Sequence, residues 1–245
     1  MMLHAGQIAG VLAVVAFASF VSRLSGFGFG LVVVPVMSLF LKAQDAVIIS
    51  TLVGLMTSMN QAWMERAHAE VATVRRLFLA ACAGMPFGLV VFVFVPEKGL
   101  RAVLGVVVVL AAFVLARGFT LRRASKGVDL GLGFLSGLLN TSVSTNGPPL
   151  VFLLQARGYE PHAFRGTISR VFFFSNVVSV SMFIAAGKVH TAAALASLLS
   201  LPLVYLMQWA GGRVAHHVHG DRFRNLVLVL LFLSGVSAVV AALTK

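Results

Sequence analysis

Long apolar segments separated by short polar connections make up almost the whole chain. They cover residues 6–22, 26–41, 45–64, 74–95, 99–117, 128–143, 147–156, 163–186, 191–210 and 224–243. A helix needs about 20 apolar residues to cross the hydrocarbon core of a bilayer. Most of the segments reach or approach that length, so the pattern predicts an all-α polytopic membrane protein.

Two of the apolar segments are too short to span. At 1.5 Å per residue, residues 147–156 reach only about 15 Å and residues 26–41 about 24 Å. Each short segment follows a polar stretch that interrupts a helix, residues 140–149 in one case and 22–30 in the other. Irregular backbone at membrane depth is tolerated only where protein covers it or where it lines a cavity. We therefore expect both interruptions to lie inside the protein.

The order of the segments predicts two similar halves, residues 1–120 and 121–245. Each half consists of a broken helical hairpin that enters the membrane and returns, followed by three spanning helices. Lysine and arginine concentrate in alternate connections, which predicts opposite orientations for the halves and places both termini outside. Such inverted repeats are common in secondary transporters. The predicted parts are hairpin 6–41 with spans 45–64, 74–95 and 99–117, and hairpin 128–156 with spans 163–186, 191–210 and 224–243.

Composition supports the membrane class. The chain is 59% hydrophobic and 11% charged, whereas charged residues make up about a quarter of a soluble domain. The net charge of +12 does not indicate nucleic-acid binding, because the basic residues lie in the connections. Cys82 is the single cysteine, so no disulfide within the chain is expected. The first residues lack the basic region of a cleaved signal peptide, so we expect the first segment to be retained.

Glycine pairs with the spacing GxxxG occur in several segments, including Gly84 with Gly88 and Gly133 with Gly137. Small residues one helical turn apart let helices approach closely in lipid. We interpret these pairs as helix-packing positions.

The two hairpin tips carry the candidate substrate-binding residues. The N-terminus of a helix has unpaired N–H groups and a partial positive charge, so it attracts anions. Hydroxyl and amide groups at the tips add hydrogen-bond donors, although they also cap the broken helices. The candidates are Arg23, Ser25, Gly28 and Gly30 at the first tip, and Asn140, Ser142, Ser144, Thr145, Asn146 and Gly147 at the second. Pro35, Pro148 and Pro149 are the expected helix-break or hinge residues.

Further polar residues fall on the predicted spans. Asn60, Arg170 and Asn176 either line the cavity or bond to neighbouring helices. A charge at the bilayer centre usually marks a pathway, but the sequence leaves open whether Arg23 lies at the midplane or at the cytoplasmic interface.

The acidic residues all fall at segment ends or in connections, so we expect no buried carboxylate to relay protons or bind a coupling cation. His216, His217 and His219 lie close together without other strong ligands nearby, and we expect no metal site and no cofactor. The chain has no nucleotide-binding or hydrolase motif, which argues against an enzyme.

The glycine- and proline-containing motifs resemble those of the TauE/SafE sulfite-exporter family. They are residues 26–35 (GFGFGLVVVP), the helix beginning Asp45-Ala46, and residues 147–154 (GPPLVFLL), 164–167 (FRGT) and 187–189 (GKV). The resemblance covers nearly the whole chain and implies a permease of the bacterial inner membrane that handles sulfite or organosulfonates. Many members repeat the glycine-rich motif in the second half. Here residues 141–146 read TSVSTN, which adds hydroxyl and amide donors.

The sequence thus predicts a secondary transporter for small sulfur-containing oxyanions, driven by the membrane potential, with the substrate held between the hairpin tips. A channel-like anion pore and a membrane assembly protein without transport activity are the alternatives. A homo-oligomer is compatible with the sequence.

Overall fold

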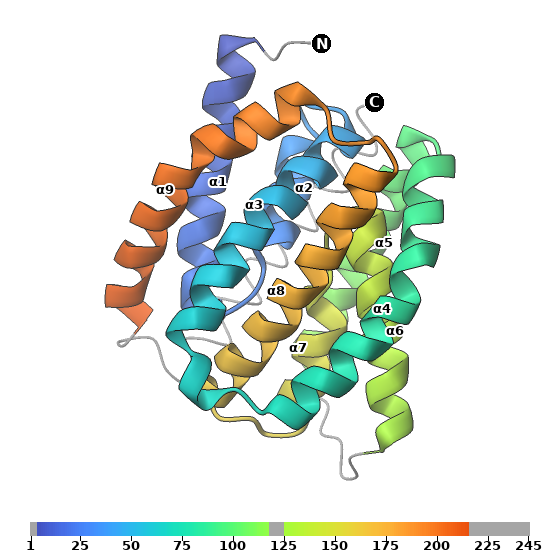
Figure 1. Cartoon of the computed structure of the whole chain (residues 1–245), viewed down its shortest axis with the longest axis vertical. Coiled ribbons are helices and arrows are strands. Elements are labelled where there is room, and N and C mark those ends of the chain that lie inside the picture. The colour runs from blue at the N-terminus through green and yellow to red at the C-terminus, as the bar shows by residue number, and fades with distance from the viewer. Residues whose placement is uncertain (1–3, 118–124, 216–245) are drawn as a thin grey trace.

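The computed structural model describes residues 4–117 and 125–215, and all regular structure in these ranges is helical (Figure 1). The predicted all-α class is therefore confirmed. The predicted span 224–243 and the cluster of His216, His217 and His219 lie outside the described residues. The elements are α1 (Ala5–Ser25), α2 (Phe29–Met37), α3 (Ala43–Met64), the 3-10 turn η1 (Arg66–His68), α4 (Val71–Phe94), α5 (Glu97–Arg117), α6 (Lys126–Val143), α7 (Gly147–Ala156), α8 (Pro161–Ala185) and α9 (Thr191–Ala215).

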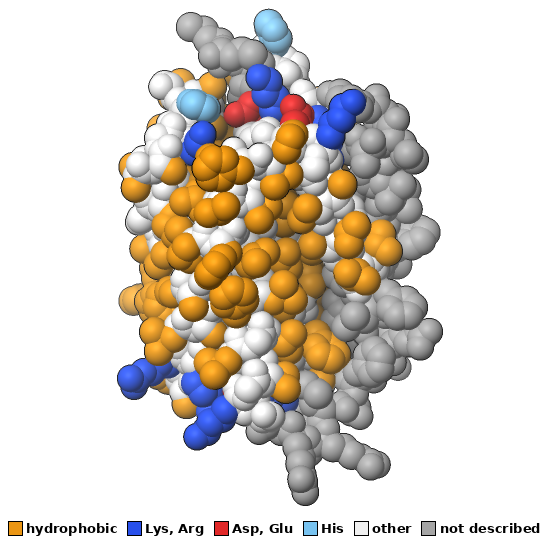
Figure 2. Space-filling model, turned by 90° about the vertical axis from the view of Figure 1, so that its right-hand side faces the viewer, with side chains coloured by type: hydrophobic (Ala, Val, Ile, Leu, Met, Phe, Trp, Pro, Cys, Tyr) orange, Lys and Arg blue, Asp and Glu red, His pale blue; other side chains and the backbone are white. Residues whose placement is uncertain are grey.

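Four described helices, α1, α4, α8 and α9, are long and apolar enough to cross a membrane by themselves. Figure 2 shows apolar side chains covering the middle of one face, with charged groups gathered at its two ends. Large apolar side chains such as Phe87, Phe94 and Leu198 are more than half exposed. An apolar belt between two charged ends matches the hydrocarbon core and the two interfaces of a bilayer.

Both helix breaks are shorter than the polar stretches that predicted them. Helix α1 continues to Ser25 and ends at Gly26, which has a φ of 80°. The Ser25 hydroxyl lies 3.0 Å from the Val21 carbonyl oxygen within the helix and 2.6 Å from the Phe27 carbonyl oxygen in the break. It also accepts a hydrogen bond from Phe27 N at 3.3 Å, so this serine caps the end of the helix. Helix α6 likewise continues through most of its polar stretch and ends at Val143. Within it, the Ser142 hydroxyl donates to the Leu138 carbonyl oxygen at 2.7 Å. A serine whose hydroxyl bonds to a carbonyl oxygen one turn back does not end a helix. The polar composition of these stretches nevertheless suggested a loop.

The two hairpins start from opposite ends of the molecule (Figure 1). Near the start of α1, the Gln7 side chain donates to the Phe40 carbonyl oxygen. Helix α3 begins at the same end, where Ala43 N donates to Glu97 Oε1 at 3.4 Å. We call this the Glu97 end, and the opposite end, where α6 and α8 begin and α3 finishes, the Glu65 end. This arrangement fits opposite orientations of the two halves. That the halves are two copies of one structural repeat remains a prediction.

Helices α4 and α6 cross in close contact. A Cβ added at Gly84 would overlap the Phe134 carbonyl oxygen, and a Cβ added at Gly137 would overlap the Ala81 carbonyl oxygen. Each helix thus uses its glycines to bring its backbone against the backbone of the other. The predicted packing role of the pairs Gly84/Gly88 and Gly133/Gly137 is confirmed.

We expect Gly137→Ala to destabilise the protein, because the added methyl group forces α6 away from Ala81. Overpacking of this kind costs about 1–3 kcal/mol, which corresponds to a fall of several degrees in the unfolding midpoint. The measurement is thermal unfolding of the purified protein in detergent. Gly131→Ala is the matched control, because a Cβ at Gly131 in the same helix meets nothing within 4 Å. Equal midpoints for the two variants would contradict the close crossing.

Candidate functional site

The two helix breaks meet in the interior of the protein. Gly30, in the first turn of α2, packs directly on the carbonyl oxygen of Ser144, where a Cβ would overlap that atom. Ser144 lies in the second break and has a φ of 52°, in the left-handed region. Its hydroxyl donates to Ser50 at 3.0 Å and accepts from Thr51 at 3.1 Å. Helix α3 therefore holds the second break in place against the first.

One face of α3 forms a polar wall beside the breaks. It carries Ser50, Gly54, Thr57, Ser58 and Gln61, whose spacing repeats at three or four residues and places them on one side of the helix. The amide of Gln61 donates to the Ser22 hydroxyl at 3.1 Å, which ties this wall to α1. Helix α8 adds Phe172 and Asn176 one turn apart, and the Asn176 amide donates to Ser58 at 3.4 Å.

These elements line a small, partly open cavity of about 40 Å³. Its lining combines hydroxyl and amide groups with aromatic and aliphatic side chains, and no described residue of the lining is charged. The lining residues are Ser22, Phe27, Gly28, Phe29, Gly30, Leu31, Ser50, Gly54, Thr57, Ser58, Gln61, Ser144, Thr145, Asn146, Gly147, Phe172 and Asn176.

The cavity has hydrogen-bond donors of two kinds. The first intrahelical bond of α2 is donated by Val32, so the N–H groups of the residues from Phe29 to Leu31 precede the helical bonding pattern. Helix α7 offers fewer backbone donors than we expected, because Pro148 and Pro149 occupy its first turn and have no N–H. The side chain of Asn146 contributes instead: its amide nitrogen is buried and has no partner among the described residues.

The structure brings about half of the predicted site residues to the cavity. Those that line it are Gly28, Gly30, Ser144, Thr145, Asn146, Gly147 and Asn176. The others have different partners. Ser25 bonds to Val21 and Phe27 at the end of its helix, and Ser142 bonds back within its helix. Asn140 donates to Ser179, Asn60 donates to Gln208, Arg170 donates to the Arg66 carbonyl oxygen, and Arg23 pairs with Glu65.

Sequence reasoning did not select Ser22 or the polar wall of α3 as site residues. A signal for the wall was present, because Ser50, Thr57, Ser58 and Gln61 recur with helical spacing along an otherwise apolar segment. Such a stripe also fits bonding between helices, and only the folded arrangement shows that it faces the two breaks.

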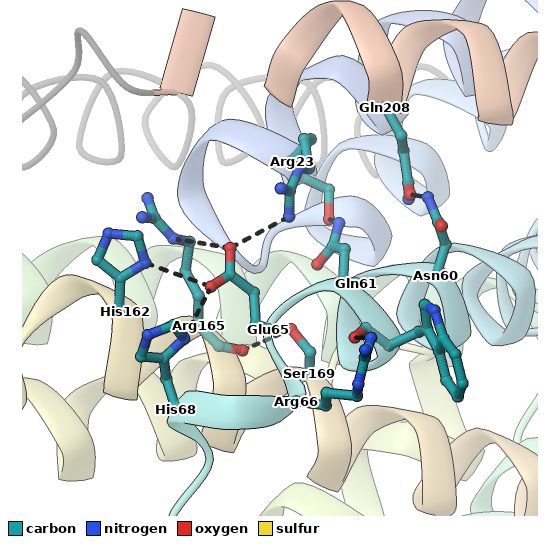
Figure 3. A network of polar contacts seen from close by, with 12 residues as sticks. Arg23, Asn60, Gln61, Glu65, Arg66, His68, His162, Arg165, Ser169 and Gln208 are labelled. Carbon is teal, nitrogen blue, oxygen red and sulfur yellow. Dashed lines mark hydrogen bonds and ion pairs between the residues drawn. The ribbon is translucent and has the colours of Figure 1, made fainter. Parts of the chain in front are cut away.

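Arg23 lies in a buried ionic cluster next to the cavity (Figure 3). Its Nη1 is 3.4 Å from Glu65 Oε1, and Arg165 Nε is 3.7 Å from the same oxygen. The side chains of all three residues are at most 10% exposed. Glu65 follows α3, Arg23 lies in the last turn of α1, and Arg165 lies near the start of α8. The cluster therefore joins three helices at the Glu65 end.

The expectation that no carboxylate is buried is wrong. Besides Glu65, Asp129 is almost fully buried and pairs with Arg157 and with Arg76, whose Nε lies 3.4 Å away. Both acids do lie at helix ends, as the sequence indicated, but neighbouring helices cover these ends. A buried carboxylate is costly unless it is paired, and the arginines supply the pairing.

The second oxygen of Glu65 faces two histidines. His162 Nδ1 lies 3.3 Å and His68 Nδ1 3.8 Å from Oε2, and the two imidazole rings are 5.1 Å apart between centroids. These residues lie at the end of α3, in η1 and in the first turn of α8. Sequence reasoning missed this set, because His162 is far from the other two along the chain.

Comparison with known proteins agrees with a membrane transporter. A protein of Comamonas testosteroni named "Probable inner membrane transporter protein TsaS" is 30% identical over 104 residues, which are 42% of this chain and 44% of that protein. The match therefore spans less than half of that relative. The "Probable sulfite/organosulfonate exporter TauE" of Cupriavidus necator is 22% identical over 243 residues, which are 96% of this chain and 94% of the relative. No solved structure gives a significant match to the chain.

The family comparison covers almost the whole chain. The family model described as "Sulfite exporter TauE/SafE" matches residues 11–238. The match includes both helix breaks, the polar wall of α3 and the ionic cluster. The chain belongs to the sulfite exporter TauE/SafE family, whose members are membrane transporters and not enzymes.

Proposed function

We propose that the protein is a secondary transporter of small sulfur-containing oxyanions, such as sulfite or a small organosulfonate, and that it binds them in the cavity between the two helix breaks. The name of the Cupriavidus relative, which aligns over nearly its whole length, supports this class of substrate. The chemistry of the cavity supports it independently, because its polar groups include several N–H and O–H donors and no carboxylate among the described lining residues.

The unpaired amide nitrogen of Asn146 carries the proposal. A buried donor without a partner costs about 1–3 kcal/mol, and that cost is recovered when an acceptor enters the cavity. An oxyanion is a strong acceptor, and hydrogen bonds to charged groups are shorter and stronger than neutral ones. The residues at the start of α2, whose backbone N–H groups precede the helical bonds, line the same cavity. The hydroxyl of Thr145 also lies there, but it donates to the Val143 carbonyl oxygen at 3.0 Å.

The size and neutrality of the cavity favour a compact ion. A volume of about 40 Å³ suits a group of a few atoms better than a long organic chain. With no charged side chain in the described lining, the ion is held by dipoles alone. Binding by dipoles lets the ion leave readily, as transport requires.

The membrane potential is the proposed driving force. An inside-negative potential of 100 mV is worth about 2.3 kcal/mol for each charge that crosses, and it pushes anions outward. The buried carboxylates Glu65 and Asp129 are not part of the described lining and are engaged by arginines. A coupling proton or cation therefore has no carboxylate beside the substrate.

The orientation follows from the positive charges at the Glu65 end. Arg66, Arg75, Arg76 and Arg157 lie in or beside the connections at this end, which favours the cytoplasmic side. Movement of the two halves against each other, with Pro35, Pro148 and Pro149 at the broken helices, would expose the cavity alternately to the two sides.

We expect Asn146→Ala to weaken transport of sulfite by proteoliposomes about 10- to 100-fold in apparent affinity. Loss of a hydrogen bond to a charged group costs about 1.5–3 kcal/mol, and 1.4 kcal/mol corresponds to a factor of ten. The measurement is the concentration dependence of uptake of radiolabelled sulfite. Asn60→Ala is the matched control, because Asn60 bonds to Gln208 and does not line the cavity. Equal effects of the two substitutions would argue against a site at the second break.

We expect sulfite efflux from proteoliposomes to follow the imposed membrane potential and to persist when only the pH gradient is removed. Potassium gradients with valinomycin set the potential, and a proton carrier removes the pH gradient while the potential is clamped. Loss of transport under that clamp would overturn the proposed driving force. Counterflow of labelled sulfite against excess unlabelled sulfite identifies a transporter, whereas its absence with non-saturable flux would indicate a pore.

A further inference from the structure

We propose that Glu65, His68 and His162 form a binding site for a first-row divalent transition-metal ion such as Zn²⁺ at the Glu65 end. Figure 3 shows the two imidazole rings and the carboxylate turned toward one another. The three candidate ligand atoms all lie within 4.8 Å of one another. Nothing in this set overlaps with the lining of the cavity, so the site is distinct from the proposed substrate site.

The two distances from Glu65 to the histidines are close to those of a tetrahedral ion, and the two histidine nitrogens lie within 4.8 Å of each other. Zinc binds histidine nitrogen and carboxylate oxygen at about 2.0–2.2 Å, so two ligand atoms of a tetrahedral site lie about 3.3–3.5 Å apart. The distance from Glu65 Oε2 to His162 Nδ1 is 3.3 Å and that to His68 Nδ1 is 3.8 Å. The second distance closes with a few tenths of an ångström of movement in a half-exposed side chain.

The surroundings of Glu65 orient its carboxylate for this role. Arg23 and Arg165 both approach Oε1, which leaves Oε2 directed at the histidines. Carboxylates that bind metals are commonly held by such outer hydrogen-bonding partners. The side chain of Glu65 is only 9% exposed, while those of His68 and His162 are 53% and 51% exposed. The metal therefore has a rigid ligand on one side and access from solvent on the other.

The ligand types and the local charge select the metal. Two imidazoles and one carboxylate suit zinc, copper or nickel, whereas magnesium and calcium prefer oxygen ligands. The nearby guanidinium groups of Arg23 and Arg165 repel any cation, so only an ion that gains strongly from imidazole nitrogen is expected to bind. The three ligands leave at least one position for water.

A bound ion would connect the end of α3, η1 and the start of α8. Gln61, one turn before Glu65, lines the cavity, and Glu65 also pairs with Arg23 of the first hairpin. Holding these elements together opposes their relative movement, so the ion is expected to slow transport. This consequence rests on the proposed function, whereas binding of the ion does not.

The first test measures binding of Zn²⁺ by isothermal titration calorimetry and thermal shift, using purified tag-free protein in detergent. The background carries His216→Asn, His217→Asn and His219→Asn, so that this histidine cluster does not contribute. In this background we expect one saturable Zn²⁺ site, no comparable response to Mg²⁺, and at least about tenfold weaker binding after His68→Ala or His162→Ala. Both histidines are half exposed, so these variants should fold.

The control is His190→Ala, because His190 lies at the opposite end beside Asp45 and Glu97. It should leave Zn²⁺ affinity unchanged. Absence of Zn²⁺ binding in the background protein, unchanged affinity in both the His68 and His162 variants, or a loss caused by His190→Ala would each overturn the site. Binding without an effect of Zn²⁺ on sulfite flux would retain the site and remove only its link to transport.

Discussion

The contact between Gly30 and the backbone of Ser144 joins the two broken hairpins, and the candidate site depends on it. Backbone groups released by a helix break cannot remain in contact with hydrocarbon, so each break needs cover from protein. Here each break covers the other, and hydroxyls of α3 bond to the second. The same arrangement creates the cavity, because short helices that begin at the breaks leave space where a continuous helix would fill it. The residues that cover the broken backbone are therefore also residues of the candidate binding site.

Charged side chains and neutral polar side chains occupy different regions of the fold. The buried ion pairs of Glu65 and Asp129 lie at the Glu65 end, while the cavity is lined by hydroxyls, amides and aromatic rings. Paired charges join helix ends that also meet through hydrogen bonds, such as that from Gln61 to Ser22. Under the proposed function, a neutral lining would let an anion enter without competing carboxylates and without binding so tightly that it cannot leave. Helix α3 links the two regions, because its polar face borders the cavity and its last turn leads to Glu65.

That polar face also explains the composition of α3. This helix has 22 residues but is not among the four helices that are apolar enough to cross a membrane alone. Most of its surface is covered by other helices, chiefly α2, α8 and α9, so lipid does not demand an apolar helix there. Thr57 and Ser58 satisfy their hydroxyls on carbonyl oxygens one turn back. Their polarity is thus compatible with burial, and both side chains still line the cavity.

The sequence by itself determined the membrane class, the helical segments, the positions of the two breaks to within a few residues and the packing role of the α4 and α6 glycines. These features follow from local hydrophobic pattern and backbone chemistry, which act over one or two helical turns. Only the tertiary structure decided that α3 forms the cavity wall, that Asn60 and Asn140 bond elsewhere, that Glu65 and Asp129 are buried, and that His162 approaches His68. These outcomes depend on which helix faces which. That choice is made by packing between segments as many as 148 residues apart, where no local pattern carries the information.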